Sequence, residues 1–102
     1  MKNLNLGGNK ISDIKVLEKV KYENLETLDL SFNEITDINI LEKVNFKELK
    51  QLNLIKNTIS DIKVLEKVIF EKLESLDLAG NKIPNNNYIS SKLRSKIKIF
   101  RS

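Results

Sequence analysis

The chain contains 102 residues, of which 40% are hydrophobic and 31% are charged, and its formal net charge is +4. This length fits one small domain, residues 1–102, and not two. Because cysteine and histidine are both absent, the composition excludes disulfides, zinc sites of the usual ligands, thiol nucleophiles and histidine general bases. Carboxylate sites for hard cations are left open, but we predict no metal and no cofactor. No apolar run approaches the roughly 18 residues that cross a bilayer, so we predict no membrane span.

The positive charge is concentrated near the C-terminus. Residues 82–102 contain six basic side chains and no acidic one, whereas the segment 1–81 contains slightly more acidic than basic side chains. A basic segment of this kind could meet nucleic acid or an anionic membrane surface. It contains no glycine-rich phosphate loop and no nucleic-acid motif. We therefore favour a basic edge strand there over a nucleic-acid site.

Along the chain, a leucine pair begins each of four similar segments that recur with a constant period of 24. The pairs are Leu4 and Leu6, Leu28 and Leu30, Leu52 and Leu54, and Leu76 and Leu78. The alternation within each pair is typical of a strand. An asparagine three residues after each pair repeats at the same step, at Asn9, Asn33, Asn57 and Asn81. A period of this length indicates a repeat architecture.

The second half of each unit has a different period. Ile14, Leu17 and Val20 are three residues apart, which suits one face of a short helix or 3₁₀ segment. An aspartate precedes each such segment, at Asp13, Asp37 and Asp61, where it can cap free backbone N–H groups. One unit cannot bury both of its apolar faces, so we expect units 1–24, 25–48, 49–72 and 73–96 to stack. Stacking places the strands in a parallel sheet, with the helical segments opposite and right-handed crossovers.

The period breaks after Ile83. Residues 97–100 alternate like a strand, and aligning Ile97 and Ile99 with Leu76 and Leu78 gives a shorter step than between the earlier pairs. We predict a terminal strand over residues 96–100 that closes the sheet, with Lys96, Lys98 and Arg101 solvated. Positive charge on an edge strand discourages unwanted pairing.

The segment 28–35, Leu-Asp-Leu-Ser-Phe-Asn-Glu-Ile, followed by Thr36-Asp37-Ile38 and Leu41, resembles a leucine-rich repeat. Its Asn-x-Ile-x-Asp-Ile stretch is most similar to the internalin and phosphatase-regulator subclass, although units there usually have about 22 residues. The resemblance covers residues 1–83 in four copies. It implies an α/β fold: a right-handed solenoid with a parallel sheet on its concave face and short helices or 3₁₀ segments on its convex face. It also implies binding of other macromolecules, usually proteins, and no catalysis.

The repeated asparagine is polar, although it lies among core positions. A buried amide must be hydrogen-bonded, so we expect each one to pair with backbone groups of the turn that leaves its strand. Stacked copies would form an asparagine ladder along the solenoid. We favour this structural role over a ligand contact because the spacing among apolar residues is regular.

If the leucines of each strand point inward, the residues between and beside them point to the concave face. Partner contacts are then predicted at Thr27, Asp29, Ser31, Phe32, Gln51, Asn53, Ile55, Lys56, Ser75 and Asp77. Phe32 and Ile55 are the apolar residues best placed as anchors. Residues 11–20 recur unchanged as residues 59–68, which indicates duplication of a two-unit block. All six positions compared at the strand exits differ between the two blocks, which favours recognition there, with chance variation as the alternative.

The predicted partner is another protein, and we predict no enzymatic activity. Asp29 and Asp77 lie two units apart, about 10 Å along the sheet, but a shallow face excludes little water. The first unit begins without a capping segment, so the chain is either a piece of a longer array or an assembly element that self-associates through that unit. The localisation stays open, and the lack of cysteine and of an export signal favours the cytoplasm.

Overall fold

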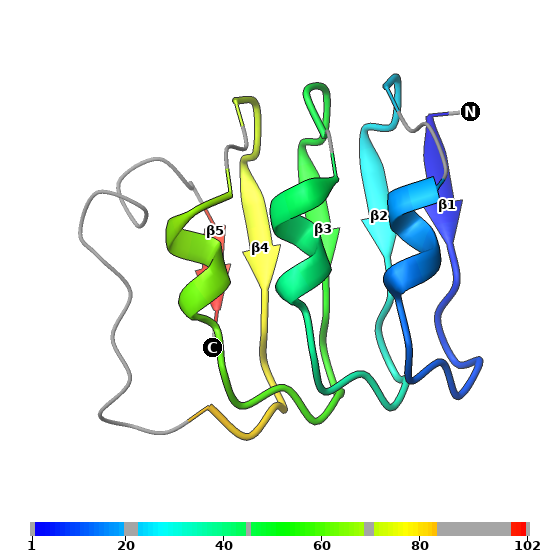
Figure 1. Ribbon diagram of the computed structural model, residues 1–102, viewed down its shortest axis with the longest axis vertical. Helices are drawn as coiled ribbons and strands as arrows, with labels where there is room; N and C mark the ends of the chain where they lie inside the picture. Colours follow the sequence, from blue (N-terminus) through cyan, green and yellow to red (C-terminus); the bar gives the residue numbers. More distant parts are fainter. Residues whose placement is uncertain (1, 20–22, 45, 69–70, 84–98, 102) are drawn as a thin grey trace.

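The structure of the protein, a computed structural model, describes residues 2–19, 23–44, 46–68, 71–83 and 99–101. Five strands form one parallel sheet in the order β1-β2-β3-β4-β5 (Figure 1). Their bounds are Asn3–Asn5 for β1, Thr27–Asp29 for β2, Gln51–Asn53 for β3, Ser75–Asp77 for β4 and Ile99–Arg101 for β5. Leu28 pairs with Leu4 on one side and with Leu52 on the other. Residues that are one sequence period apart therefore pair with each other in the sheet.

One short 3₁₀ segment follows each of the first three strands. These segments are η1 (Lys15–Lys19), η2 (Asn39–Lys43) and η3 (Lys63–Glu66). Figure 1 shows all three on the same face of the sheet, and neighbouring segments contact each other. We call the side that carries them the convex face and the opposite side of the sheet the concave face.

An aspartate fixes the start of each 3₁₀ segment. The first backbone N–H group of the segment donates to a carboxylate oxygen two residues earlier. The bonds join Lys15 to Asp13, Asn39 to Asp37 and Lys63 to Asp61, at 2.9, 2.8 and 3.0 Å. These N–H groups have no partner within the segment, so the predicted capping is confirmed.

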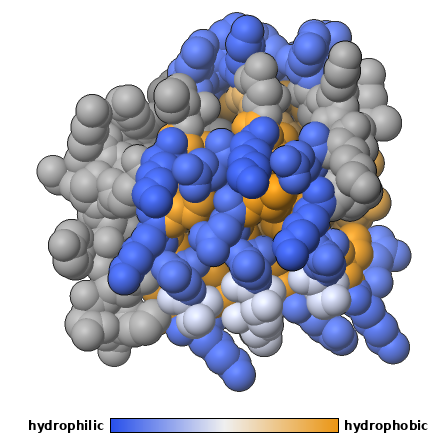
Figure 2. All heavy atoms as spheres, viewed as in Figure 1, coloured by the Kyte–Doolittle hydropathy of each residue, from blue (hydrophilic) through white to orange (hydrophobic). Residues whose placement is uncertain are grey.

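The core lies between the sheet and the 3₁₀ segments. Repeated leucines and isoleucines fill it, with Phe46 as a large aromatic side chain that is 1% exposed. Each buried leucine contributes on the order of 1.5–3 kcal/mol before chain entropy is subtracted. Figure 2 shows hydrophilic side chains over the convex face, with apolar atoms visible between them. The predicted α/β solenoid, with its parallel sheet and its 3₁₀ segments on one side, is confirmed.

The register of β5 differs from the prediction. The alternation in residues 97–100 matched Ile97 to Leu76, whereas in the structure Leu76 pairs with Phe100. The step from Leu76 to Phe100 is the same as the step from Leu52 to Leu76. This register places β5 level with the other strands, so its backbone groups extend the same ladder. Lys96 and Lys98, which we expected in or beside this strand, lie outside the described residues.

Candidate functional site

Two rows of polar side chains cross the concave face, one from each end of the strands. The first row contains the first residue of each of the strands β1 to β4: Asn3, Thr27, Gln51 and Ser75. The second row contains the last residue: Asn5, Asp29, Asn53 and Asp77. Neighbouring strands lie about 4.8 Å apart, so each row brings together side chains that are a whole repeat unit apart in the chain.

A shallow hollow of about 290 Å³ opens between these rows over β1, β2 and β3. Its polar lining consists of Asn3, Asn5, Thr27, Asp29, Gln51 and Asn53. Within it, the Thr27 hydroxyl donates a hydrogen bond to Oδ1 of Asn3. Amide and hydroxyl groups can both donate and accept hydrogen bonds, so the hollow suits polar groups of a partner.

The second row also holds the turns that leave the strands. Oδ1 of each Asn or Asp accepts a bond from the backbone N–H two residues later. The donors are Gly7 for Asn5, Ser31 for Asp29, Ile55 for Asn53 and Ala79 for Asp77, at 2.9, 2.9, 3.0 and 3.1 Å. An amide and a carboxylate both offer this oxygen, which explains why either Asn or Asp can occupy this position. This role in the turns was not predicted, although Asn or Asp in all four copies was a signal for it.

Ser31 differs from its prediction. We expected its side chain to be exposed for a partner, but it is only 7% exposed. Its Oγ donates to Asp29 Oδ1 at 2.6 Å, so the hydroxyl is turned back onto the strand end. Ser31 therefore supports the turn and offers little surface to a partner.

The repeated asparagines bind backbone groups of two successive units. Nδ2 of Asn57 donates to the carbonyl oxygens of Leu54 and Ile55 in its own turn and of Leu30 in the preceding one, at 3.1, 3.4 and 3.0 Å. Its Oδ1 accepts from the Ile35 N–H at 3.0 Å. Asn33 and Asn81 make the equivalent bonds to their own turn and the turn before it. Each of these amides therefore ties its unit to the unit before it.

The second residue after each leucine pair has a left-handed backbone. We call these four residues the strand-exit positions: Gly8, Phe32, Lys56 and Gly80, with φ of 73°, 55°, 56° and 75°. Glycine adopts this conformation readily, whereas a bulky side chain is strained in it. Phe32 is 61% exposed, Lys56 is exposed and the neighbouring Ile55 is half-buried. Two strand-exit positions therefore present side chains that the turn itself disfavours.

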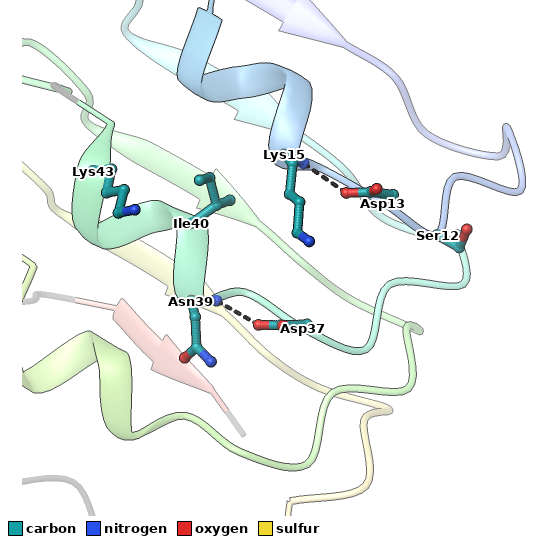
Figure 3. Close-up of a pocket in the computed structure, with 7 residues that line it drawn as sticks. All are labelled: Ser12, Asp13, Lys15, Asp37, Asn39, Ile40 and Lys43. Carbon is teal, nitrogen blue, oxygen red and sulfur yellow. Dashed lines mark hydrogen bonds between the residues drawn. The ribbon is translucent and has the colours of Figure 1, made fainter.

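The convex face has a second hollow, between η1 and η2 (Figure 3). It measures about 380 Å³ and is lined by Ser12, Asp13, Lys15, Asp37, Asn39, Ile40 and Lys43. The two carboxylates that reach it are those of Asp13 and Asp37, each bonded to the first N–H of its 3₁₀ segment (Figure 3). These acidic groups are thus already used by the fold.

Charged side chains also pair between units. Glu26 lies 3.9 Å from both Lys2 and Lys50, measured from carboxylate oxygen to ammonium nitrogen. Lys72 donates to Glu48 at 2.9 Å, and this bond raises the pKa of Lys72 above its usual value. All of these pairs are at least partly exposed, so each contributes little to stability.

Two kinds of site are not found in the part of the chain that the structure describes. No group of three or more acidic side chains lies close enough together to hold a metal ion. No helix in that part has the length and hydrophobicity needed to cross a membrane.

Comparison with known families agrees with the geometry. A family model described as leucine-rich repeats in two copies matches residues 1–43 and 23–67, and a single leucine-rich-repeat model matches residues 71–86. The chain belongs to the leucine-rich-repeat family. The predicted family is therefore confirmed, and proteins of this family are typically protein-binding modules without catalytic activity.

This leucine-rich-repeat chain is also similar to a solved structure, the internalin InlF from Listeria monocytogenes. The two share 30% sequence identity with a TM-score of 0.76, and the match covers 98% of this chain. It covers 28% of the InlF chain, so the repeat domain spans little more than a quarter of that protein. No curated protein sequence matches the chain.

The predicted partner residues fall into two groups in this leucine-rich-repeat fold. Those of β2 and β3, namely Thr27, Asp29, Gln51 and Asn53, meet in the concave hollow, and Ser75 and Asp77 continue the two rows on β4. Phe32, Ile55 and Lys56 lie beyond the strand ends. The left-handed backbone at the strand-exit positions was missed, although glycine at two of the four, Gly8 and Gly80, was a signal for it.

Proposed function

We propose that this leucine-rich-repeat domain binds a protein partner through its concave face. The observation that carries the proposal is the hollow of about 290 Å³ over β1 to β3, which is lined by residues of both polar rows. Contacts are assigned to Thr27, Asp29, Gln51, Asn53, Ser75 and Asp77, with Phe32, Ile55 and Lys56 at the strand exits. Non-obligate protein interfaces are about as polar as the rest of the protein surface, and aromatic residues such as Phe32 are enriched in them.

Site-specific photo-crosslinking tests this proposal. A benzoylphenylalanine at Gln51, exposed on the concave face, is compared with one at Lys63, exposed on the convex face of the same unit. In extracts of the source cells, we expect a crosslinked protein at Gln51 that excess unlabelled chain removes, and no such product at Lys63. Equal products at both positions, or none at Gln51, would contradict the proposal.

A second candidate function is assembly through β1. Leu4 and Leu6 pack against the core but stay half-buried, whereas Leu28 and Leu30 are each 1% exposed. Apolar surface at a strand edge favours contact with another chain. Analytical ultracentrifugation would then show a dimer that Leu4→Glu converts to a monomer with an unchanged circular dichroism spectrum. A monomer at every concentration would remove this candidate.

A further inference from the structure

The fold, and not the side chain, sets the backbone at the strand-exit positions. The N–H groups of Gly8, Phe32 and Lys56 each donate to a carbonyl of the next turn, at 3.0, 2.8 and 2.9 Å. These bonds continue the ladder of the sheet beyond the strands. A residue at such a position must therefore accept a positive φ, whatever its side chain.

Phe32 gains little burial in return for this strain. Its side chain is 61% exposed and is the one large hydrophobic side chain exposed among the described residues. Gly8 and Gly80 occupy equivalent positions with φ of 73° and 75°, so the turn forms well without a side chain. Strain that persists without a structural gain points to function.

The Lys56 side chain has a defined direction, which leads away from Phe32. A Cβ atom built at Gly80 would lie 2.8 Å from Lys56 Cδ and 3.2 Å from its Cε, so the lysine stem lies across the next strand-exit turn. Within the described chain, the Lys56 ammonium makes no hydrogen bond or ion pair. Its charge is therefore available to a partner.

Within the strand-exit turns, residues 7–10, 31–34, 55–58 and 79–82, the exposed charged residues besides Lys56 are Lys10, Lys82 and Glu34. The carboxylates of Asp29 and Asp77 at the strand ends are half-buried and accept hydrogen bonds from turn N–H groups. An excess of positive charge steers acidic partners to a surface and disfavours basic ones.

We propose that Phe32 and Lys56 anchor an acidic segment of a protein partner. An apolar side chain of that segment packs on the Phe32 ring, and a carboxylate pairs with the Lys56 ammonium. The backbones of the two positions lie in adjacent units, about 4.8 Å apart along the sheet, and the Lys56 stem extends one unit further, over Gly80. A segment that runs across the strand-exit turns from Phe32 towards Gly80 therefore reaches both groups. The inference rests on the proposed function and names the chemistry of its partner.

Peptide selection tests this inference without knowledge of the natural partner. The probe is a phage-displayed library of random dodecapeptides, selected on the immobilised full chain. One selection contains excess soluble Phe32→Asn/Lys56→Asn variant as a competitor, and a parallel selection contains none. Asparagine tolerates a positive φ, so the competitor keeps the turn while it lacks both anchors.

We expect the competed selection to enrich peptides that combine Asp or Glu with an apolar residue. A synthetic peptide from it should bind Phe32→Asn about tenfold more weakly than wild type. It should bind Lys56→Asn several-fold more weakly, with a smaller dependence on salt. Each substitution should also raise the melting temperature by a few degrees, because strain is relieved. Higher stability with weaker binding separates an anchor from a residue that merely supports the fold.

Lys10→Asn is the matched control, because Lys10 is exposed and has the same φ of 55° as Phe32. Its melting temperature should rise similarly, while peptide affinity stays within about twofold. The inference is overturned if no peptide survives competition, if the surviving peptides lack acidic residues, or if they bind Phe32→Asn as tightly as wild type. Peptides from the parallel selection that fail to bind Gln51→Arg but still bind Phe32→Asn would overturn this inference and leave the concave-face proposal standing. Peptides that bind both variants normally would count against the concave-face proposal as well.

Discussion

Phe32 and Asn33 are neighbours in the chain, yet they have opposite relations to the fold. Asn33 is 7% exposed and makes five hydrogen bonds to backbone groups of two turns. Phe32 is 61% exposed and contributes its backbone N–H to the ladder, while its side chain points away from the core. The stacking of units determines which residue type stands at position 33, whereas at position 32 it determines only the backbone conformation.

This contrast shows how a repeat domain can separate stability from recognition. The ladder needs a side chain that donates to carbonyls and accepts from an N–H group at one point, and an amide does both. Asparagine therefore stands at this position in all four units. The strand-exit position needs only a backbone conformation, so Gly8, Phe32, Lys56 and Gly80 can all occupy it. Variation there changes the surface without breaking the stack.

Loss of a ladder amide should have the largest effect. Asn57→Ala removes four hydrogen bonds from a side chain that is 4% exposed. It should lower the free energy of unfolding by about 2–3 kcal/mol, because buried backbone groups lose their partners. Urea denaturation followed by circular dichroism measures this change.

Asn9→Ala is the matched control for that substitution. Asn9 holds the same place in the first unit but is exposed, and its Nδ2 donates to Leu6 and Gly7 carbonyls near solvent. The expected loss is about 1 kcal/mol or less, since water replaces the lost bonds. Equal losses at Asn9 and Asn57 would show that burial of the ladder does not determine its contribution.

A smaller effect is expected where the side chain supports only its own turn. Asp29 Oδ1 accepts from the Ser31 N–H and Oγ, so Asp29→Ala should destabilise the fold by about 1–2 kcal/mol. Asp29→Asn keeps the accepting oxygen and should stay within about 0.5 kcal/mol of wild type. Thermal unfolding of both variants distinguishes the contribution of the accepting oxygen from that of the negative charge. If Asp29→Asn were as destabilising as Asp29→Ala, the carboxylate charge itself would be needed.

The sequence was sufficient to predict the stack, because its period fixes both the strand register and the core. Leu28 and Leu52 are paired and buried as the alternation required. The bonding of Asn57 also follows from a general rule, since a buried amide must find partners. These features depend on apolar spacing and hydrogen-bond satisfaction, which a repeating sequence displays directly.

Three features were harder to predict: a backbone angle, the burial of one side chain and the register of the last strand. The positive φ at Phe32 arises from bonds between neighbouring turns, and the residue type argues against it. Burial of Ser31 depends on where its hydroxyl turns, which alternation alone does not determine. The register of β5 was misjudged because Ile97 and Ile99 suggested a strand face, whereas the pairing of Phe100 with Leu76 follows the period of the preceding units.

The smallest effect that sharpens the comparison concerns the two glycines at strand-exit positions. Gly80→Ala and Gly8→Ala both place a side chain at a positive φ, so each should destabilise the fold by about 1 kcal/mol. A Cβ at Gly8 meets nothing within 4 Å, whereas one at Gly80 would lie 2.8 Å from Lys56 Cδ. Gly80→Ala should therefore be worse by a few tenths of a kcal/mol, because the lysine stem can move aside. A double-mutant cycle with Lys56→Ala should remove this excess. A persistent excess would mean that the lysine stem does not lie across Gly80 in solution, and the direction given to the Lys56 charge would then be wrong.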